Sequence, residues 1–264
     1  MKTLLLSLLL LRPYEISLPV NMDSPALIIV LHGHGGTALG LPSIVGQPEN
    51  TIVIAPYGLG QSWNGNNCCG YAYQNDVDDV AAISDLIDNM IDGGCDPDRV
   101  FILGLSNGGM LAHKLAGALS HKIAAIADIS GCIGGKASPY MDVAMPDQPS
   151  ESVSIFIAHG VLDEVVPFAQ DWEAPASRWD LPFMTGVKFW RTACRYDMEA
   201  ATEYGDDYEM RRYYPTERDA QRPRALMTMI FPGGKHDLAR WPEIMKRVLK
   251  FFERHPKTRD RRRK

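Results

Sequence analysis

The sequence predicts an α/β protein with a mostly parallel central sheet and helices on both of its faces. Short apolar, β-branched runs alternate with helical patterns along the chain, which is typical of βαβ units. The runs are apolar throughout, as expected for strands that helices cover on both sides. A chain of 264 residues, of which 45% are hydrophobic and 22% charged, is long enough for one domain around one large core.

Six apolar runs are the candidate strands, and three stretches are the candidate helices. The expected strands are residues 26–31, 51–55, 100–105, 124–129, 153–158 and 226–231. The expected helices run from about 76 to 91, from just after Ser106 to about Leu119, and over WPEIMKRVLKFFER. The first and last of these repeat apolar residues at a spacing that gives one buried stripe.

The first helix opens with NDVDD, a cluster of carboxylates. Asp76, Asp78 and Asp79 are predicted to be capping and dipole charges, because carboxylates stabilise the positive N-terminal end of a helix. A metal site is the alternative interpretation of this cluster.

Two stretches fit the alternation badly, residues 134–152 and 171–224, and the second is rich in charge, proline and aromatic residues. Long irregular segments in a compact domain are usually functional or mobile. We therefore expect lid or specificity insertions at both places.

The net charge of −5 argues against a nucleic-acid partner, which requires clustered positive charge on the folded part. Residues 254–264, RHPKTRDRRRK, are basic and are expected to form a solvated, disordered tail. The five cysteines show no paired CxxC spacing, which argues against a structural zinc site.

The chain begins MKTLLLSLLLL, with one lysine before a leucine-rich stretch, as in a secretory signal. No small-residue cleavage site precedes Arg12, and the apolar run is too short to span a bilayer. A signal remnant and a first strand are both open interpretations. We expect a secreted or periplasmic protein without a membrane partner.

The chemistry centres on VFILGLSNGGM, residues 100–110, where an apolar strand runs through G-x-S-x-G into a helical pattern. A strand that reverses into a helix within a few residues leaves no room for side chains beside the turn, so glycines flank the serine. Ser106 is therefore the candidate nucleophile.

A serine hydroxyl needs a base to take its proton and an acid to orient that base. In a fold with this turn the order along the chain is serine, acid, histidine. Asp163 in HGVLDEVVP and His236 in FPGGKHDL follow later candidate strands and are the predicted acid and base. Glu164 is the nearest substitute for the acid. For the other histidines considered as bases, His113, His121 and His255, a solvated surface position is expected.

Four motifs in order, SWNGNNCCGYAYQNDVDDV, FILGLSNGGM, HGVLDEVVPF and GGKH with a following WP, resemble the polyhydroxybutyrate-depolymerase-like esterases. That group includes feruloyl and acetylxylan esterases of the α/β-hydrolase fold. The resemblance covers most of residues 26–242 and implies the same serine, acid and base, a carboxylic ester substrate and no cofactor. We expect one α/β-hydrolase domain over residues 1–253. The last motif departs from the family's GGGH-WPG, because Lys235 replaces a glycine and DLAR intervenes.

The developing oxyanion requires two N–H donors, of which one is expected to be the backbone amide of Asn107. The other is expected from the loop HGHGG after residue 31, and the resemblance assigns it to the amide of His34. The two histidines of this loop also suggest a metal clip or a catalytic base. Since acid and base are supplied elsewhere, we expect His32 to hold the loop by hydrogen bonds.

Trp63 and the adjacent Cys68 and Cys69 follow the strand at 51–55, on the ligand-binding side of the predicted sheet. Trp63 is a candidate wall of the substrate pocket or else a core tryptophan. One of the two adjacent cysteines is expected to pair elsewhere, with Cys95 or Cys194, if the protein is exported.

The expected function is a serine carboxylic-ester hydrolase acting through an acyl-enzyme on a small-molecule or oligomeric ester. Feruloyl or acetyl esters of plant polysaccharide are favoured over short hydroxyalkanoate polyesters. A peptidase and a catalytically silent binding protein are the remaining alternatives.

Overall fold

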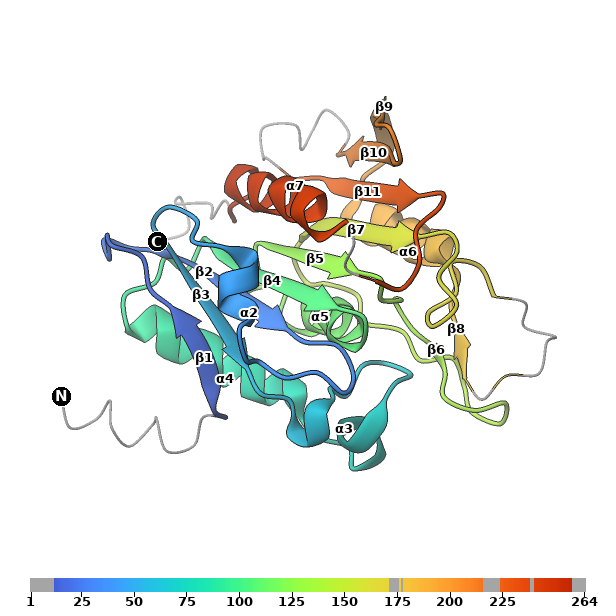
Figure 1. Ribbon diagram of the computed structural model, residues 1–264, viewed down its shortest axis with the longest axis horizontal. Helices are drawn as coiled ribbons and strands as arrows, with labels where there is room; N and C mark the ends of the chain where they lie inside the picture. The colour runs from blue at the N-terminus through green and yellow to red at the C-terminus, as the bar shows by residue number, and fades with distance from the viewer. Residues whose placement is uncertain (1–11, 171–175, 177, 216–223, 238–239, 258–264) are drawn as a thin grey trace.

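A nine-stranded sheet with helices on both faces forms the centre of the computed structural model, which describes residues 12–170, 176, 178–215, 224–237 and 240–257 (Figure 1). In the described residues, the strand order is β1-β3-β2-β4-β5-β7-β11-β10-β9. The strands are β1 (Tyr14–Ser17), β2 (Ala26–Leu31), β3 (Thr51–Pro56), β4 (Val100–Leu105), β5 (Ala125–Ile129), β7 (Ser154–Gly160), β9 (Met198–Tyr204), β10 (Glu209–Tyr214) and β11 (Leu226–Phe231). The run from β3 to β11 is parallel, which confirms the predicted fold class.

Helices cover the two faces of the sheet separately. They are α2 (Leu41–Val45), α3 (Gly70–Gln74), α4 (Asp79–Asp92), α5 (Asn107–Ala118), α6 (Phe183–Cys194) and α7 (Trp241–Arg254), with a 3-10 turn η1 (Leu59–Gln61). Successive residues of a strand face opposite sides. In β2, Leu27 and Ile29 pack with α4, α5 and α6, whereas Ile28 and Val30 pack with α2 and α7. This double burial explains why the central strands read as unbroken apolar runs.

The prediction that residues 171–224 form one irregular segment was wrong. Its described part holds α6, the antiparallel pair β9 and β10, and the short strand β8 (Trp179–Asp180). Four apolar residues of α6 recur at helical spacing and are buried, namely Phe183, Val187, Trp190 and Cys194. The charge-rich strands around the helix masked that signal. Residues 134–152 are irregular except for β6 (Gly135–Lys136), which pairs with β8.

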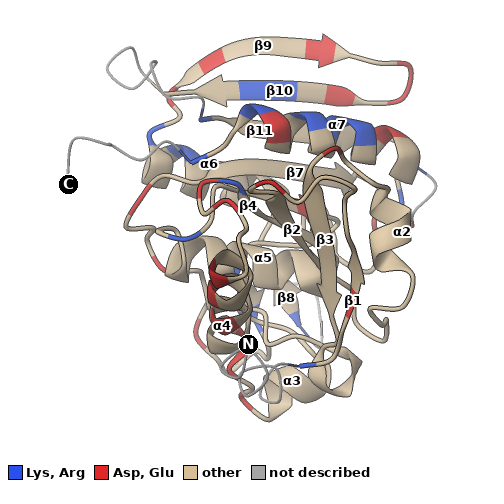
Figure 2. Cartoon of the chain, turned by 90° about the vertical axis from the view of Figure 1, so that its left-hand side faces the viewer, with Lys and Arg blue, Asp and Glu red and all other residues tan. Residues whose placement is uncertain are grey.

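Ion pairs hold the outer hairpin of β9 and β10 near α7. Glu203 of β9 lies 2.7 Å from Arg212 of β10 and 3.1 Å from Arg247 of α7, measured between oxygen and nitrogen. Figure 2 shows the acidic and basic residues of these elements close to one another. The two strands at this edge of the sheet carry many charged residues. Hydrophobic periodicity therefore did not predict them as strands.

Both ends of the chain extend the fold beyond what was predicted. β1 pairs antiparallel with β3, while residues 1–11, with their two interpretations, lie outside the described residues. The proposed tail begins inside the fold: His255 is buried and bonds Phe251 O at 2.7 Å, which corrects its expected surface position. Residues 258–264 are not described. Among the described residues, no helix has the length and apolar character needed to cross a membrane.

Candidate active site

Ser106 occupies a tight turn between β4 and α5. Its φ of 51° and ψ of −117° are sparsely populated by residues with a side chain. A Cβ on Gly104 would lie 2.2 Å from Gly108 O, and one on Gly108 would lie 2.3 Å from Leu31 O. Both flanking glycines are therefore required by close packing, as the G-x-S-x-G pattern predicted.

Ser106, His236 and Asp163 form one hydrogen-bonded array at the carboxyl edge of the sheet. His236 Nε2 lies 3.0 Å from Ser106 Oγ, and His236 Nδ1 lies 2.7 Å from Asp163 Oδ2. The three residues follow β4, β11 and β7, whose parallel directions bring their ends to the same edge. With Nδ1–H donated to the carboxylate, Nε2 is free to accept the serine proton.

Asp163 is fixed from both of its oxygens. Its Oδ1 accepts the backbone N–H groups of Val165 at 2.9 Å and Val166 at 2.8 Å, opposite the bond from His236. Burial by itself raises the pKa of this carboxyl, but the hydrogen bonds from His236 and Val166 outweigh it and lower the pKa. The buried group is thus held as a carboxylate, whereas the neighbouring Glu164 is exposed.

His32 is a loop brace, as predicted. Its Nδ1 lies 2.8 Å from Gly33 O and its Nε2 accepts the Gly58 N–H at 3.0 Å. Burial lowers the pKa of this imidazole more than the Gly33 bond raises it. Because both ring nitrogens are occupied by backbone groups, His32 has no lone pair left for a metal or a substrate proton.

The loop that carries His34 lies against Ser106. A Cβ on Gly33 would fall 3.5 Å from Ser106 Cβ, and a Cβ on Gly70 would fall 2.5 Å from His34 Cε1. Within the described part of the chain, the amides of His34 and Asn107 donate to no backbone acceptor. These two N–H groups are accordingly available as oxyanion donors.

Comparison with known proteins agrees with this fold. The phospholipase/carboxylesterase family matches residues 72–175. The acetyl xylan esterase of Aspergillus awamori superposes with a TM-score of 0.61 at 19% identity, over 90% of this chain and 93% of that one. The chain has the α/β-hydrolase fold. The carboxylesterase of Bacillus cereus has the same fold, with a TM-score of 0.56 at 13% identity over 96% and 99% of the two chains.

Two curated relatives of this chain come from Neurospora crassa. Feruloyl esterase B is 28% identical over 147 residues, covering 51% of this chain and 48% of the relative. Feruloyl esterase D is 29% identical over 184 residues, covering 60% and 55%. The chain thus spans about half the length of these relatives. The similarity to feruloyl and acetyl xylan esterases, which the motifs predicted, is confirmed.

Replacement of His34 tests whether its backbone amide or its side chain matters for activity. His34→Pro deletes the amide donor and is expected to lower kcat by about 10²–10³-fold. His34→Ala keeps the amide and is expected to retain most of the activity. Steady-state kinetics on a short p-nitrophenyl ester compare the two variants; equal losses in both would refute the backbone role.

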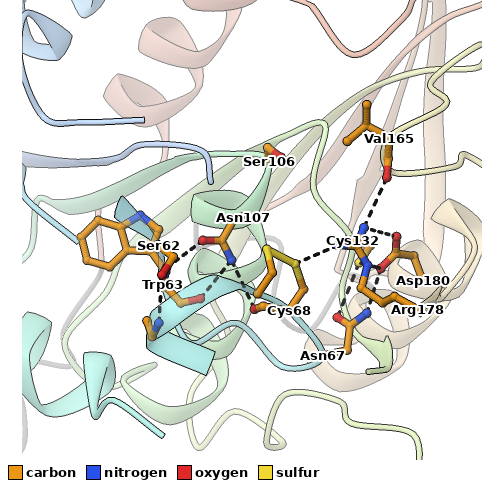
Figure 3. The surroundings of a disulfide bond; sticks show 12 residues. Ser62, Trp63, Asn67, Cys68, Ser106, Asn107, Cys132, Val165, Arg178 and Asp180 are labelled. Carbon is orange, nitrogen blue, oxygen red and sulfur yellow. Dashed lines mark hydrogen bonds and ion pairs between the residues drawn. A yellow bond between two sulfur atoms is a disulfide. The ribbon is translucent and has the colours of Figure 1, made fainter. Parts of the chain in front are cut away.

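The structure excludes Trp63 as a wall of the substrate pocket. Its side chain is fully buried, with Nε1–H donated to His32 O at 2.9 Å. Its backbone N–H donates to Asn107 Oδ1 at 2.7 Å, while Asn107 Nδ2 donates to Trp63 O and Cys68 O (Figure 3). Trp63 is therefore the core tryptophan of the two alternatives, and the Asn107 side chain braces its loop.

The expected pairing of the adjacent cysteines was also wrong. Cys68 and Cys69 form a disulfide with each other, and Cys95, Cys132 and Cys194 are free and buried. Cys95 and Cys194 belong to the core on one face of the sheet, whereas Cys68 packs with Met110, Cys132 and Val166. Cys95 and Cys194 therefore pack in a different cluster from Cys68. Burial raises the pKa of Cys95 and Cys194 to about 11, which keeps them protonated.

Sequence patterns missed a buried polar network in α5. His113, expected on the surface, lies 3.0 Å from Asp128 Oδ2 through Nε2 and accepts the Trp190 Nε1–H at 2.9 Å through Nδ1. It is 1% exposed, because the helix after the nucleophile is buried on nearly every side. A helix that follows a G-x-S-x-G turn is buried almost throughout, and this expectation would have predicted a buried position for His113.

The acidic start of α4 has two different roles. Asp78 caps the helix by accepting the Ala81 N–H at 2.9 Å, as predicted. Asp79 is buried and accepts both Arg12 Nη1 at 2.5 Å and the Asn64 N–H at 2.6 Å. The second carboxylate thus ties the Trp63 loop to the start of the sheet.

Acidification is expected to destabilise the folded protein partly through His32. Because its pKa is lowered in the folded state, the unfolded chain binds the proton more readily. The stabilisation is complete above the usual value of 6.5 and is lost as the pH falls below it. Urea midpoints at about pH 7.5 and 5.5 should differ less in His32→Gln than in wild type, with the exposed His34→Gln as control. An equal pH effect in His32→Gln would contradict this origin.

Proposed function

We propose that this chain is a serine carboxylic-ester hydrolase that acts through an acyl-enzyme. The hydrogen-bonded array of Ser106, His236 and Asp163 is the observation that carries the proposal. His236 takes the proton as Ser106 Oγ attacks the ester carbonyl, and Asp163 stabilises the imidazolium that forms. The same histidine then protonates the leaving alcohol.

Deacylation repeats the steps with water in place of the serine. His236 removes a proton from the water, which attacks the acyl carbonyl, and returns the proton to Ser106 Oγ as the acid leaves. In both steps the amides of His34 and Asn107 stabilise the oxyanion. Neither step requires a cofactor.

The proposed substrates are feruloyl or acetyl esters of plant polysaccharide. The names of the similar proteins, two feruloyl esterases and an acetyl xylan esterase, support this class. The disulfide between Cys68 and Cys69 supports a secreted or periplasmic location, since disulfides persist in oxidising compartments.

Wild-type activity on matched esters tests the proposal. We expect hydrolysis of p-nitrophenyl acetate, and a higher kcat/KM on methyl ferulate or acetylated xylan than on hydroxybutyrate oligomers. A higher kcat/KM on hydroxybutyrate oligomers would mean that the substrate is a polyester and not an ester of plant polysaccharide. Absence of hydrolysis on all of these esters, together with cleavage of a peptide p-nitroanilide, would overturn it in favour of a peptidase.

A further inference from the structure

A partly buried ion pair outside the central sheet joins the loops that carry the proposed catalytic groups. Arg178 donates to Asp180 twice, from Nε to Oδ1 at 2.8 Å and from Nη2 to Oδ2 at 2.7 Å. The Asp180 side chain is 2% exposed and that of Arg178 is 24% exposed. A two-point bond between a planar guanidinium and a carboxylate fixes orientation as well as distance. Because an ion pair that is wholly or partly removed from water is weak evidence for stability, the position of this pair calls for another explanation.

The carboxylate of this pair holds the loop next to the nucleophile. Asp180 Oδ1 also accepts Asn67 Nδ2 at 2.8 Å and the Cys132 thiol at 3.3 Å (Figure 3). The residue after Asn67 is Cys68, whose carbonyl accepts the Asn107 side chain at 3.2 Å. Asp180 is therefore linked through Asn67 and Cys68 to Asn107, whose backbone amide is a proposed oxyanion donor.

The guanidinium of the pair reaches the acid loop at the same time. Arg178 Nη2 lies 3.3 Å from Val165 O, and the N–H of Val165 donates to Asp163 Oδ1. Arg178 Nη1 lies 2.9 Å from Cys68 Sγ on the other side (Figure 3). One side chain thus contacts both the loop after β3 and the loop after β7.

We infer that Arg178 and Asp180 are positioning residues, an inference that rests on the proposed function. They hold the oxyanion donor, the backbone amide of Asn107, and the acid, Asp163, in the correct positions relative to each other. Both contribute only to the placement of other groups. Loss of the pair leaves Ser106, His236 and Asp163 in the chain but frees two loops on which their alignment depends. A displacement of about 1 Å at a reacting centre lowers the rate by about 10²-fold.

Four variants and one matched control test the inference. The variants are Arg178→Met, Arg178→Lys, Asp180→Asn, and the double variant Arg178→Met with Asp180→Asn. Arg212→Met is the control, because Arg212 has the same 24% side-chain exposure and also pairs with a carboxylate at 2.7 Å, but in the outer hairpin. Each protein is assayed for kcat and KM on p-nitrophenyl acetate, for inhibition by a trifluoromethyl ketone, and for its thermal midpoint.

We expect Arg178→Met to lower kcat by about 10²-fold, with KM changed less than about threefold. Inhibition by the ketone, whose serine adduct carries an oxyanion, should weaken by a similar factor. Arg178→Lys should recover only part of the loss, because an ammonium cannot bond both carboxylate oxygens in one plane. The double variant should lose no more than the worse single variant, since both remove one interaction.

Several results would overturn the inference. These are a kcat of Arg178→Met within about twofold of wild type, a change confined to KM, or an equal loss of kcat in Arg212→Met. If Arg178→Met does not fold, Arg178→Lys and Asp180→Asn decide, and an unchanged kcat in both would overturn it. A wild-type chain without esterase activity would instead overturn the proposed function.

Discussion

Ser106→Ala is expected to lower kcat on a short p-nitrophenyl ester by about 10⁶-fold, the largest effect of any single change in this chain. The variant keeps His236, Asp163 and the oxyanion donors but has no oxygen to form the acyl-enzyme. The methyl group fits the space of the hydroxymethyl, so the positive φ at this turn and the packing of the two flanking glycines are retained. The fold should therefore persist, and the loss should be confined to kcat.

Activity and circular dichroism of Ser106→Ala should be compared with those of Ser17→Ala, which lies in the edge strand β1. We expect wild-type spectra for both variants and wild-type activity for Ser17→Ala. Retention of a tenth of the activity by Ser106→Ala would mean that another nucleophile performs the reaction.

Asp163→Asn is expected to lower kcat by about 10⁴-fold while leaving KM near its wild-type value. The geometry explains the size of the effect. Oδ1 accepts two backbone N–H groups, from Val165 and Val166, so the asparagine must direct its carbonyl oxygen there. Its NH₂ group then faces His236 Nδ1, which is forced to accept. The proton moves to Nε2, and the imidazole can no longer take one from Ser106.

Glu164→Gln is the matched control for this carboxylate, because it removes a charge from the adjacent, exposed position. Its kcat should stay within about twofold of wild type. A similar loss in both variants would point to the general field of the loop, and not to the tautomer of His236, as the origin of the effect.

The sequence predicted the central strands to within about two residues, because helices on both faces require unbroken apolar runs. It also predicted which side chains meet, since Ser106, Asp163 and His236 each follow a parallel strand. The outer hairpin and β1 were missed because edge strands carry charged or exposed residues. These strands lack the periodicity of the core.

Side-chain contacts between distant segments were beyond sequence reasoning. Nothing in RWD, residues 178–180, indicates that Arg178 reaches both Cys68 and Val165. The predicted surface position of His113 was wrong because its hydrogen-bond partners lie in other elements, Asp128 in β5 and Trp190 in α6. The adjacent cysteines pair with each other because the thiols considered as partners pack in a different part of the core.

Covalent labelling of the serine tests the central claim most directly. Wild-type protein is incubated with an activated organophosphonate, and the intact mass and tryptic peptides are measured beside Ser106→Ala and Asp163→Asn. We expect one adduct per chain on Ser106, no adduct in Ser106→Ala, and much slower labelling of Asp163→Asn. An adduct on another residue, or undiminished ester hydrolysis by protein labelled at Ser106, would contradict the proposed mechanism.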